Sequence, residues 1–134
     1  MGYSGTPVAR KLGITPATRV ALIGAPESVL DALPDGVRVS LRLTGRFEVI
    51  VAPFTERSAL ERRLPALVRA LEPAGGLWLA WPKRSSGVAS DLSDGVVREL
   101  GLGAGLVDNK VCAIDETWSG LRFVYRLRDR PLTA

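Results

Sequence analysis

The order of apolar and amphipathic segments constrains the fold of this chain more than any other feature. Three runs, at residues 19–24, 49–54 and 77–81, are almost continuously apolar. A strand that is apolar on both faces is covered on both faces, so these runs predict central, parallel strands. Helical patterns lie between the runs, which indicates crossover connections of the kind that parallel strands require.

A fourth strand is expected at residues 37–43, and its pattern is different. Valine and leucine alternate there with Arg38, Ser40 and Arg42. This alternation predicts one buried face and one wet face. We therefore expect this strand at an edge of the sheet.

Two longer helices are expected. In residues 55–73 the leucines recur at helical spacing on one face. Pro65 is predicted to break or kink this helix, so two helical pieces are expected. A second helix is expected at residues 91–100, with Ser90 or Asp91 as its cap and Gly101 at its end.

The two ends of the chain have their own patterns. Thr6 and Pro7 predict the start of a short helix that ends at Gly13, and residues 3–6 either cap this helix or fold over a binding crevice. Strands at residues 106–114 and 121–128, with a turn at residues 117–120, form an antiparallel hairpin. The expected architecture is a three-layer α/β domain of 134 residues, with a mostly parallel central sheet.

A parallel sheet that ends in an antiparallel hairpin resembles the class I methyltransferase form of the Rossmann fold. The segment LEPAGGLWLAWPK, at residues 71–83, is similar to the stretch in which such proteins leave a helix and enter a central strand. The resemblance implies the strand order second, first, third, fourth, sixth, fifth, with about one βα unit fewer than usual. It also implies a Gly-x-Gly-x-Gly loop and an acidic ribose anchor, and the chain has neither: the loop reads IGAPE, and the second strand ends in LRLT.

A second resemblance covers most of the chain. The stretches GYSGTPVARKLGI, WPKRSSGVASDL and GLVDNKVCAIDETWSGLRFVYR, at residues 2–14, 81–92 and 105–126, resemble signatures of a family of small bacterial proteins. That family is known as a domain of unknown function. The resemblance therefore implies a fold and a bacterial source, and no activity.

Composition excludes several kinds of site. The chain has no histidine and one cysteine, which excludes Ser-His-Asp catalysis, histidine-ligated zinc and an internal disulfide. The net charge of +4 is mild and its arginines are scattered, so we do not expect nucleic-acid binding. No apolar run reaches the length of a membrane span, and the N-terminus lacks a secretory pattern, so a cytoplasmic location is expected.

Candidate ligand-binding residues gather where the parallel strands are expected to end. Ligands of open α/β sheets bind outside the carboxyl ends of the strands, at the switch point. Lys83 is one of three lysines and follows an apolar strand, so it is a candidate for holding a phosphate or carboxylate, or else is a solvated loop lysine. Asp108 and Asp115 are either paired carboxylates or partners in ordinary ion pairs. The full candidate set is Gly24, Ala25, Glu27, Thr55, Lys83, Ser85 and Asp108.

Three functions remain open at this point. The first is a non-catalytic binding or regulatory module with a small-molecule or protein partner. The second is a diverged methyltransferase-like enzyme that binds a nucleotide-type ligand at the carboxyl edge of the sheet. The third, an acidic-partner or nucleic-acid binder, would use Arg38, Arg42 and the arginines near the C-terminus. The sequence identifies no catalytic residue, cofactor or metal, and a monomer and a homodimer paired through an edge strand are equally expected.

Overall fold

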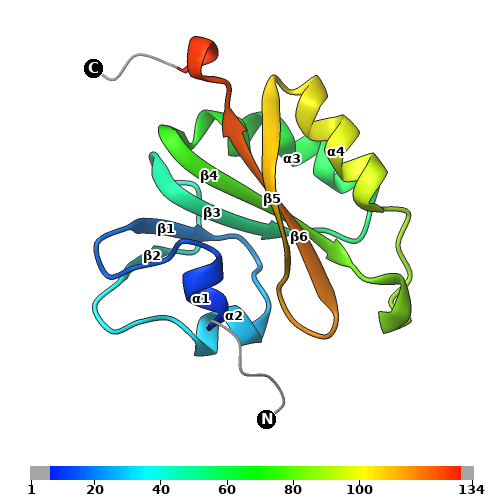
Figure 1. The fold of residues 1–134 in the computed structure, drawn as a ribbon, viewed down its shortest axis with the longest axis horizontal. Helices are drawn as coiled ribbons and strands as arrows, with labels where there is room; N and C mark the ends of the chain where they lie inside the picture. Colours follow the sequence, from blue (N-terminus) through cyan, green and yellow to red (C-terminus); the bar gives the residue numbers. More distant parts are fainter. Residues whose placement is uncertain (1–6, 131–134) are drawn as a thin grey trace.

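The computed structural model describes residues 7–130, and its strands form one six-stranded sheet (Figure 1). The strands are β1 (Arg19–Leu22), β2 (Arg38–Ser40), β3 (Phe47–Pro53), β4 (Leu71–Pro82), β5 (Leu106–Ala113) and β6 (Trp118–Tyr125). The α-helices are α1 (Val8–Lys11), α2 (Glu27–Asp31), α3 (Arg57–Arg69) and α4 (Asp94–Gly103). Two 3-10 turns, η1 (Arg84–Ser86) and η2 (Leu127–Asp129), follow β4 and β6.

The strand order confirms the expected topology. The sheet runs β2-β1-β3-β4-β6-β5, with the first four strands parallel and β6 antiparallel to both of its neighbours. The three apolar runs are the adjacent strands β1, β3 and β4, and β2 lies at an edge. The three-layer α/β prediction, with a mostly parallel sheet and an antiparallel C-terminal hairpin, is therefore correct.

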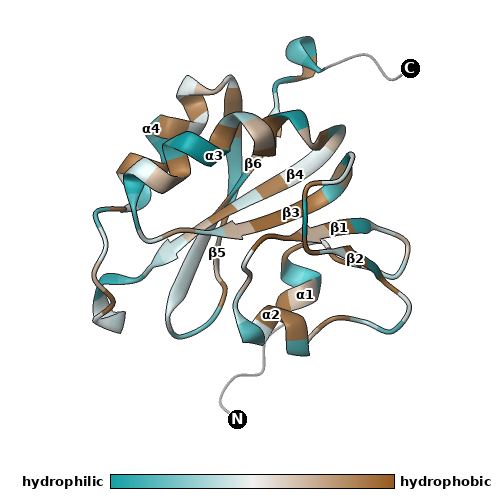
Figure 2. Cartoon of the chain, turned by 180° about the vertical axis from the view of Figure 1, so that it is seen from behind, coloured by the Kyte–Doolittle hydropathy of each residue, from teal (hydrophilic) through white to brown (hydrophobic). Residues whose placement is uncertain are grey.

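The helices cover the sheet on two sides (Figure 1). Helices α1 and α2 pack on one face, and α3 and α4 pack on the other. In β3, the fully buried neighbours Ile50 and Val51 belong to opposite clusters, as expected for a strand covered on both faces. Figure 2 shows the hydrophobic colour along β3 and a mixture of both colours on α3 and α4.

A hydrogen bond from the core fixes α1 on its face of the sheet. The Trp78 indole is fully buried, and its Nε1 donates to the Leu12 carbonyl oxygen at 2.9 Å. Gly13 follows with a φ of +84°, so the helix ends where the sequence predicted. The cap expected at Thr6 and the crevice cover expected at residues 3–6 lie outside the described residues.

The predicted break at Pro65 is wrong, because α3 is continuous from Arg57 to Arg69. Pro65 is exposed, while the sheet-facing Leu60, Leu64 and Leu67 are buried. The proline removes one helical hydrogen bond from the solvent side. Tertiary packing of the leucine face stabilises the helix on both sides of that gap.

The predicted limits of the second long helix are also wrong. Helix α4 begins after Ser93, whose hydroxyl accepts from the Val96 N–H at 3.3 Å. The expected caps bond elsewhere: Ser90 donates to Thr55 before α3, and Asp91 accepts from the N–H of Arg57, the first residue of α3. Gly101 lies inside the helix and not at its end. A glycine is needed there because the Phe123 ring occupies the space that a side chain would take.

The hairpin and the edge strand differ from the sequence pattern in their limits. The turn covers residues 115–117, before Trp118, and β6 ends at Tyr125. In the edge strand only Arg38–Ser40 are paired, and Leu41 is 68% exposed. Val37 and Leu43 pack against opposite core clusters, so the alternating residues do not share a single buried face.

The packing of α4 on β6 gives a test of this part of the core. Gly101→Ala should lower the free energy of unfolding by about 2 kcal/mol, because the new methyl group overlaps the buried Phe123 ring. Gly95→Ala, in open space on the same helix, should raise it by up to about 1 kcal/mol. Urea unfolding of both variants measures the two changes. If both substitutions stabilise the protein, Gly101 and Phe123 are not in tight contact.

Candidate functional site

The carboxyl ends of the central parallel strands meet at one edge of the sheet. Strands β1, β3 and β4 end at Leu22, Pro53 and Pro82. The chain leaves β1 for α2 on one face and leaves β3 for α3 on the other face. This divergence between neighbouring strands is a topological switch point, where open α/β sheets bind their ligands.

The loop after β1 is open at this edge. Gly24 has a φ of +74°, and no atom lies within 4 Å of the position that a Cβ would take. Ala25 packs against the α1–α2 side of the core, and Pro26 precedes the first residue of α2. Glu27, in the first turn of this short helix, is exposed.

The loop after β3 is tied to the segment before α4. The Ser90 hydroxyl donates to the Thr55 carbonyl oxygen at 2.6 Å, and the Arg57 N–H donates to Asp91 Oδ1 at 2.7 Å. These two bonds hold the β3 loop beside the β4–α4 connection. Sequence reasoning missed this role of Ser90 and Asp91, because both residues also suit a helix cap.

The loop after β4 has a fixed backbone around Lys83. Its N–H donates to the Thr117 carbonyl oxygen at 2.7 Å, and its carbonyl oxygen accepts from the Ser86 hydroxyl at 2.6 Å. The Lys83 side chain is half-buried and Ser85 is exposed. Within residues 7–130, no ion pair includes Lys83.

Asp115 joins the hairpin turn to α2. Its Oδ1 accepts from the N–H groups of Thr117 and Trp118, each at 2.8 Å, and its Oδ2 accepts from the Ser28 hydroxyl at 2.7 Å. The bonds to the next two or three N–H groups are those of an Asx turn. An aspartate before two polar residues and a strand is a signal for that turn, whereas nothing in the sequence indicates Ser28 as the third partner.

Asp108 lies away from this edge, which corrects its expected place in the site. On β5, Asp108 is opposite Phe123 of β6, and Phe123 pairs with Leu77 of β4. Leu77 lies five residues, about 17 Å, before Pro82 at the end of β4. Asp108 Oδ2 accepts from Arg98 Nε at 3.1 Å, and this bond, with a second to Asp94, raises the pKa of the Arg98 guanidinium. The hypothesis that Asp108 and Asp115 form a carboxylate pair is therefore wrong.

The single cysteine has a protected thiol. Cys112 is 8% exposed on β5, and its burial raises the pKa of the thiol. The positive charges of Lys11, Lys110 and Lys83 act in the opposite direction and lower that pKa. Burial has the larger effect, which disfavours the thiolate and makes the thiol a weak nucleophile.

The structure brings six of the seven candidate residues to one edge of the sheet. Gly24, Ala25 and Glu27 follow β1, Thr55 follows β3, and Lys83 and Ser85 follow β4. Among residues 7–130, no three acidic or cysteine side chains are grouped closely enough to hold a metal ion. In the same part of the chain, no helix has the length and apolar character needed to cross a membrane.

Two solved methyltransferases and a pre-rRNA processing protein have a similar fold. One is the ribosomal protein L11 methylase from Lactobacillus delbrueckii subsp. bulgaricus. The match covers 89% of this chain and 75% of that protein, with a TM-score of 0.58 and 11% identity. The 1,6-didemethyltoxoflavin-N1-methyltransferase from Burkholderia thailandensis has 1,6-didemethyltoxoflavin and S-adenosylhomocysteine bound. The match covers 87% of this chain and 73% of that protein, with a TM-score of 0.58 and 11% identity. For the pre-rRNA processing protein fibrillarin from Methanococcus jannaschii, the match covers 92% of this chain and 70% of that protein, with a TM-score of 0.54 and 12% identity.

At these identities the likeness establishes a methyltransferase-like Rossmann fold. No protein-family profile and no curated protein matches the chain. The resemblance of residues 2–14, 81–92 and 105–126 to a family of small bacterial proteins therefore stays a prediction.

The bonds of Asp115 give a test of how the edge is held together. Asp115→Ala should lower the free energy of unfolding by about 2 kcal/mol, because it removes three hydrogen bonds to a charged acceptor. Ser28→Ala removes one of the three and should cost about 1 kcal/mol. Urea unfolding compares both variants with the wild type. An Asp115→Ala protein as stable as the wild type would contradict this role.

Proposed function

We propose that this chain is a diverged methyltransferase-like protein that binds a nucleotide-type ligand at the carboxyl edge of β1, β3 and β4. The structural neighbours that carry S-adenosylhomocysteine include the toxoflavin methyltransferase and CalO1, a methyltransferase in calicheamicin biosynthesis. CalO1 matches 90% of this chain over 52% of its own, with a TM-score of 0.57 and 16% identity. These neighbours support the enzyme-like hypothesis better than the non-catalytic module.

The observation that carries the proposal is the open backbone at Gly24. Its left-handed φ and the free space around it allow a flat ligand group to approach the loop between β1 and α2. This is the loop that dinucleotide-binding sheets use for the same purpose. Exposed Glu27 lies three residues further on, at the start of α2, and it is a candidate acceptor for hydroxyl or amino groups of the ligand.

Lys83 favours a ligand that also carries an anion. Its half-buried side chain starts from a backbone held on both sides by hydrogen bonds. An ammonium group in that position would pair with a carboxylate or phosphate. An adenosine joined to an amino-acid carboxylate, as in S-adenosylhomocysteine, has both parts.

The residues fit such a ligand only in part. The loop after β1 has one glycine, and Pro26 provides no N–H group. Strand β2 ends at Ser40, whose hydroxyl donates to the Arg42 carbonyl oxygen at 2.7 Å, and no carboxylate follows to hold ribose hydroxyls. The residues present therefore support ligand binding at the loop after β1.

A matched glycine pair tests the site by calorimetry with S-adenosylhomocysteine and S-adenosylmethionine. Gly24 and Gly36 have φ values of +74° and +82° in equally open space, but Gly36 lies in the loop before β2, at the opposite edge. An alanine should strain either backbone by about 1 kcal/mol. Only Gly24→Ala should also weaken binding, by about tenfold or more, because its methyl group would face the ligand.

Lys83→Gln separates the anion contact from the loop contact. It should weaken S-adenosylhomocysteine binding by about tenfold and leave adenosine binding unchanged, because adenosine has no carboxylate. Absence of binding by all three compounds, or equal binding by Gly24→Ala and Gly36→Ala, would contradict the proposed site. If the site binds these compounds, an assay of methyl transfer to a substrate would distinguish an enzyme from a binding module.

A further inference from the structure

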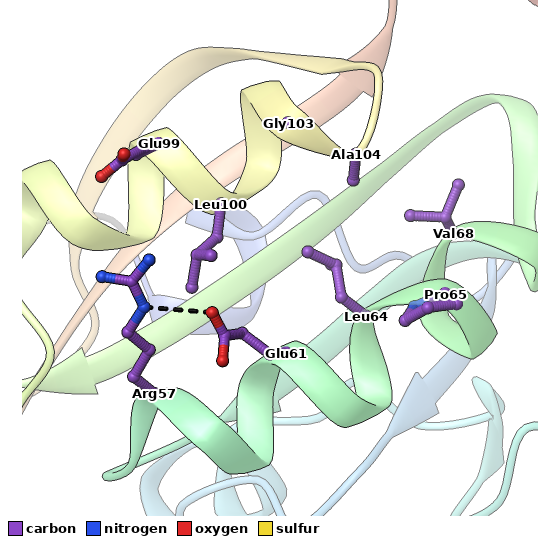
Figure 3. A pocket seen from close by; sticks show the side chains of 9 residues that line it. All are labelled: Arg57, Glu61, Leu64, Pro65, Val68, Glu99, Leu100, Gly103 and Ala104. Atoms are coloured by element: carbon purple, nitrogen blue, oxygen red, sulfur yellow. Dashed lines mark hydrogen bonds and ion pairs between the residues drawn. The ribbon is translucent and has the colours of Figure 1, made fainter.

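A groove lies between α3 and α4, on the face of the sheet that these helices cover (Figure 3). Its volume is about 570 Å³, and it is separate from the carboxyl-edge site. Leu64 and Leu100 extend into the space between the helices. The apolar part of the lining consists of Leu64, Pro65, Val68, Leu100, Gly103 and Ala104.

The polar part of this groove favours a positively charged occupant. Glu61 and Glu99 line it, against one cation, Arg57, whose Nε already donates to Glu61 Oε2 at 3.1 Å. Pro65 has no N–H, so the Glu61 carbonyl one turn earlier lacks its helical donor. With two carboxylates against one guanidinium, the charged side chains that line the groove leave it with a net negative charge.

The direction of the helices adds negative potential at one end of the groove. Both helices follow parallel strands and return along the sheet, so their C-termini lie at the same edge. Val68 on α3 and Ala104 after α4 mark that end. Helix C-termini carry partial negative charge, which attracts cations.

A segment with the complementary chemistry begins beside the same end. The Tyr125 hydroxyl, at the end of β6, donates to the Val68 carbonyl oxygen at 2.7 Å. Beyond it, Leu127 is 78% exposed, the most exposed of the large hydrophobic residues described. Three arginines surround it against one aspartate, in the order Arg126, Arg128, Asp129 and Arg130.

We propose that the α3–α4 groove receives the Leu127 segment, residues 126–130, of a second copy of this chain. Leu127 does not line the groove of its own chain, so its side chain is free to enter another. Segment and groove are neighbours on each copy, so one two-fold axis can pair both segments with both grooves. The contact buries an exposed leucine in an apolar groove and brings arginines to Glu61 and Glu99.

Sedimentation equilibrium of the full chain over a range of concentrations tests this proposal, which is independent of the nucleotide site. The wild type should form a dimer, and Leu127→Glu should weaken it by about tenfold or more, because a carboxylate would enter an acidic groove. Val111→Glu is the matched control. Val111 is 63% exposed on the edge strand β5 and should have no effect on the dimer.

A charge exchange identifies the pairing directly. Glu99→Arg should weaken the dimer, and Arg128→Glu in the same chain should restore it, because the opposite charges again face each other. Circular dichroism checks that each variant is folded. A wild-type monomer at all concentrations would overturn the proposal, even if a basic apolar peptide bound the groove, since the occupant would then be another protein. A dimer lost with Val111→Glu and kept with Leu127→Glu would overturn it in favour of edge-strand pairing.

Discussion

The two-sided burial of β1, β3 and β4 is the constraint on which the rest of the structure depends. In β3, four consecutive residues, Val49 to Ala52, are buried, and alternate side chains contact opposite helix layers. Burial of this kind requires helices on both faces, and parallel strands require crossover connections. The carboxyl ends of these strands therefore meet at one edge, with loops that leave in different directions. The candidate site is a consequence of this arrangement.

Polar contacts then fix the loops that the apolar core leaves at the edge. Asp115 joins the hairpin turn to α2, Ser90 joins the loops after β3 and β4, and Thr117 continues the pairing of β6 as far as Lys83. Gly24 in the loop after β1 and Gly87 in the loop after β4 each stand in open space with a left-handed backbone. A rigid edge with open glycine positions is suited to binding, because little conformational entropy is lost when a ligand arrives.

The sequence predicted the layers and the strand order, since burial patterns and the resemblance to methyltransferases depend on whole segments. The sequence also predicted that six candidate residues lie at one edge of the sheet, because each comes within a few residues of the end of a central strand. It failed where a contact between distant residues decides the outcome. The leucine face of α3 overrides Pro65, and Phe123 requires a glycine at position 101. Neither contact leaves a periodic signal in the sequence. Asp108 is a different case: it lies near the start of β5, which runs in the same direction as β4, so it belongs to the opposite edge of the sheet.

The most direct test of the carboxyl-edge site is a ¹⁵N–¹H NMR titration of the full chain with S-adenosylhomocysteine. Amide shifts should concentrate at residues 23–25, 27, 54–56 and 83–87, on the three loops that follow β1, β3 and β4. The amides of α3 and α4 that border the groove should be unaffected. No shifts at saturating ligand, or shifts confined to α3 and α4, would contradict the central claim that this edge binds a nucleotide-type ligand.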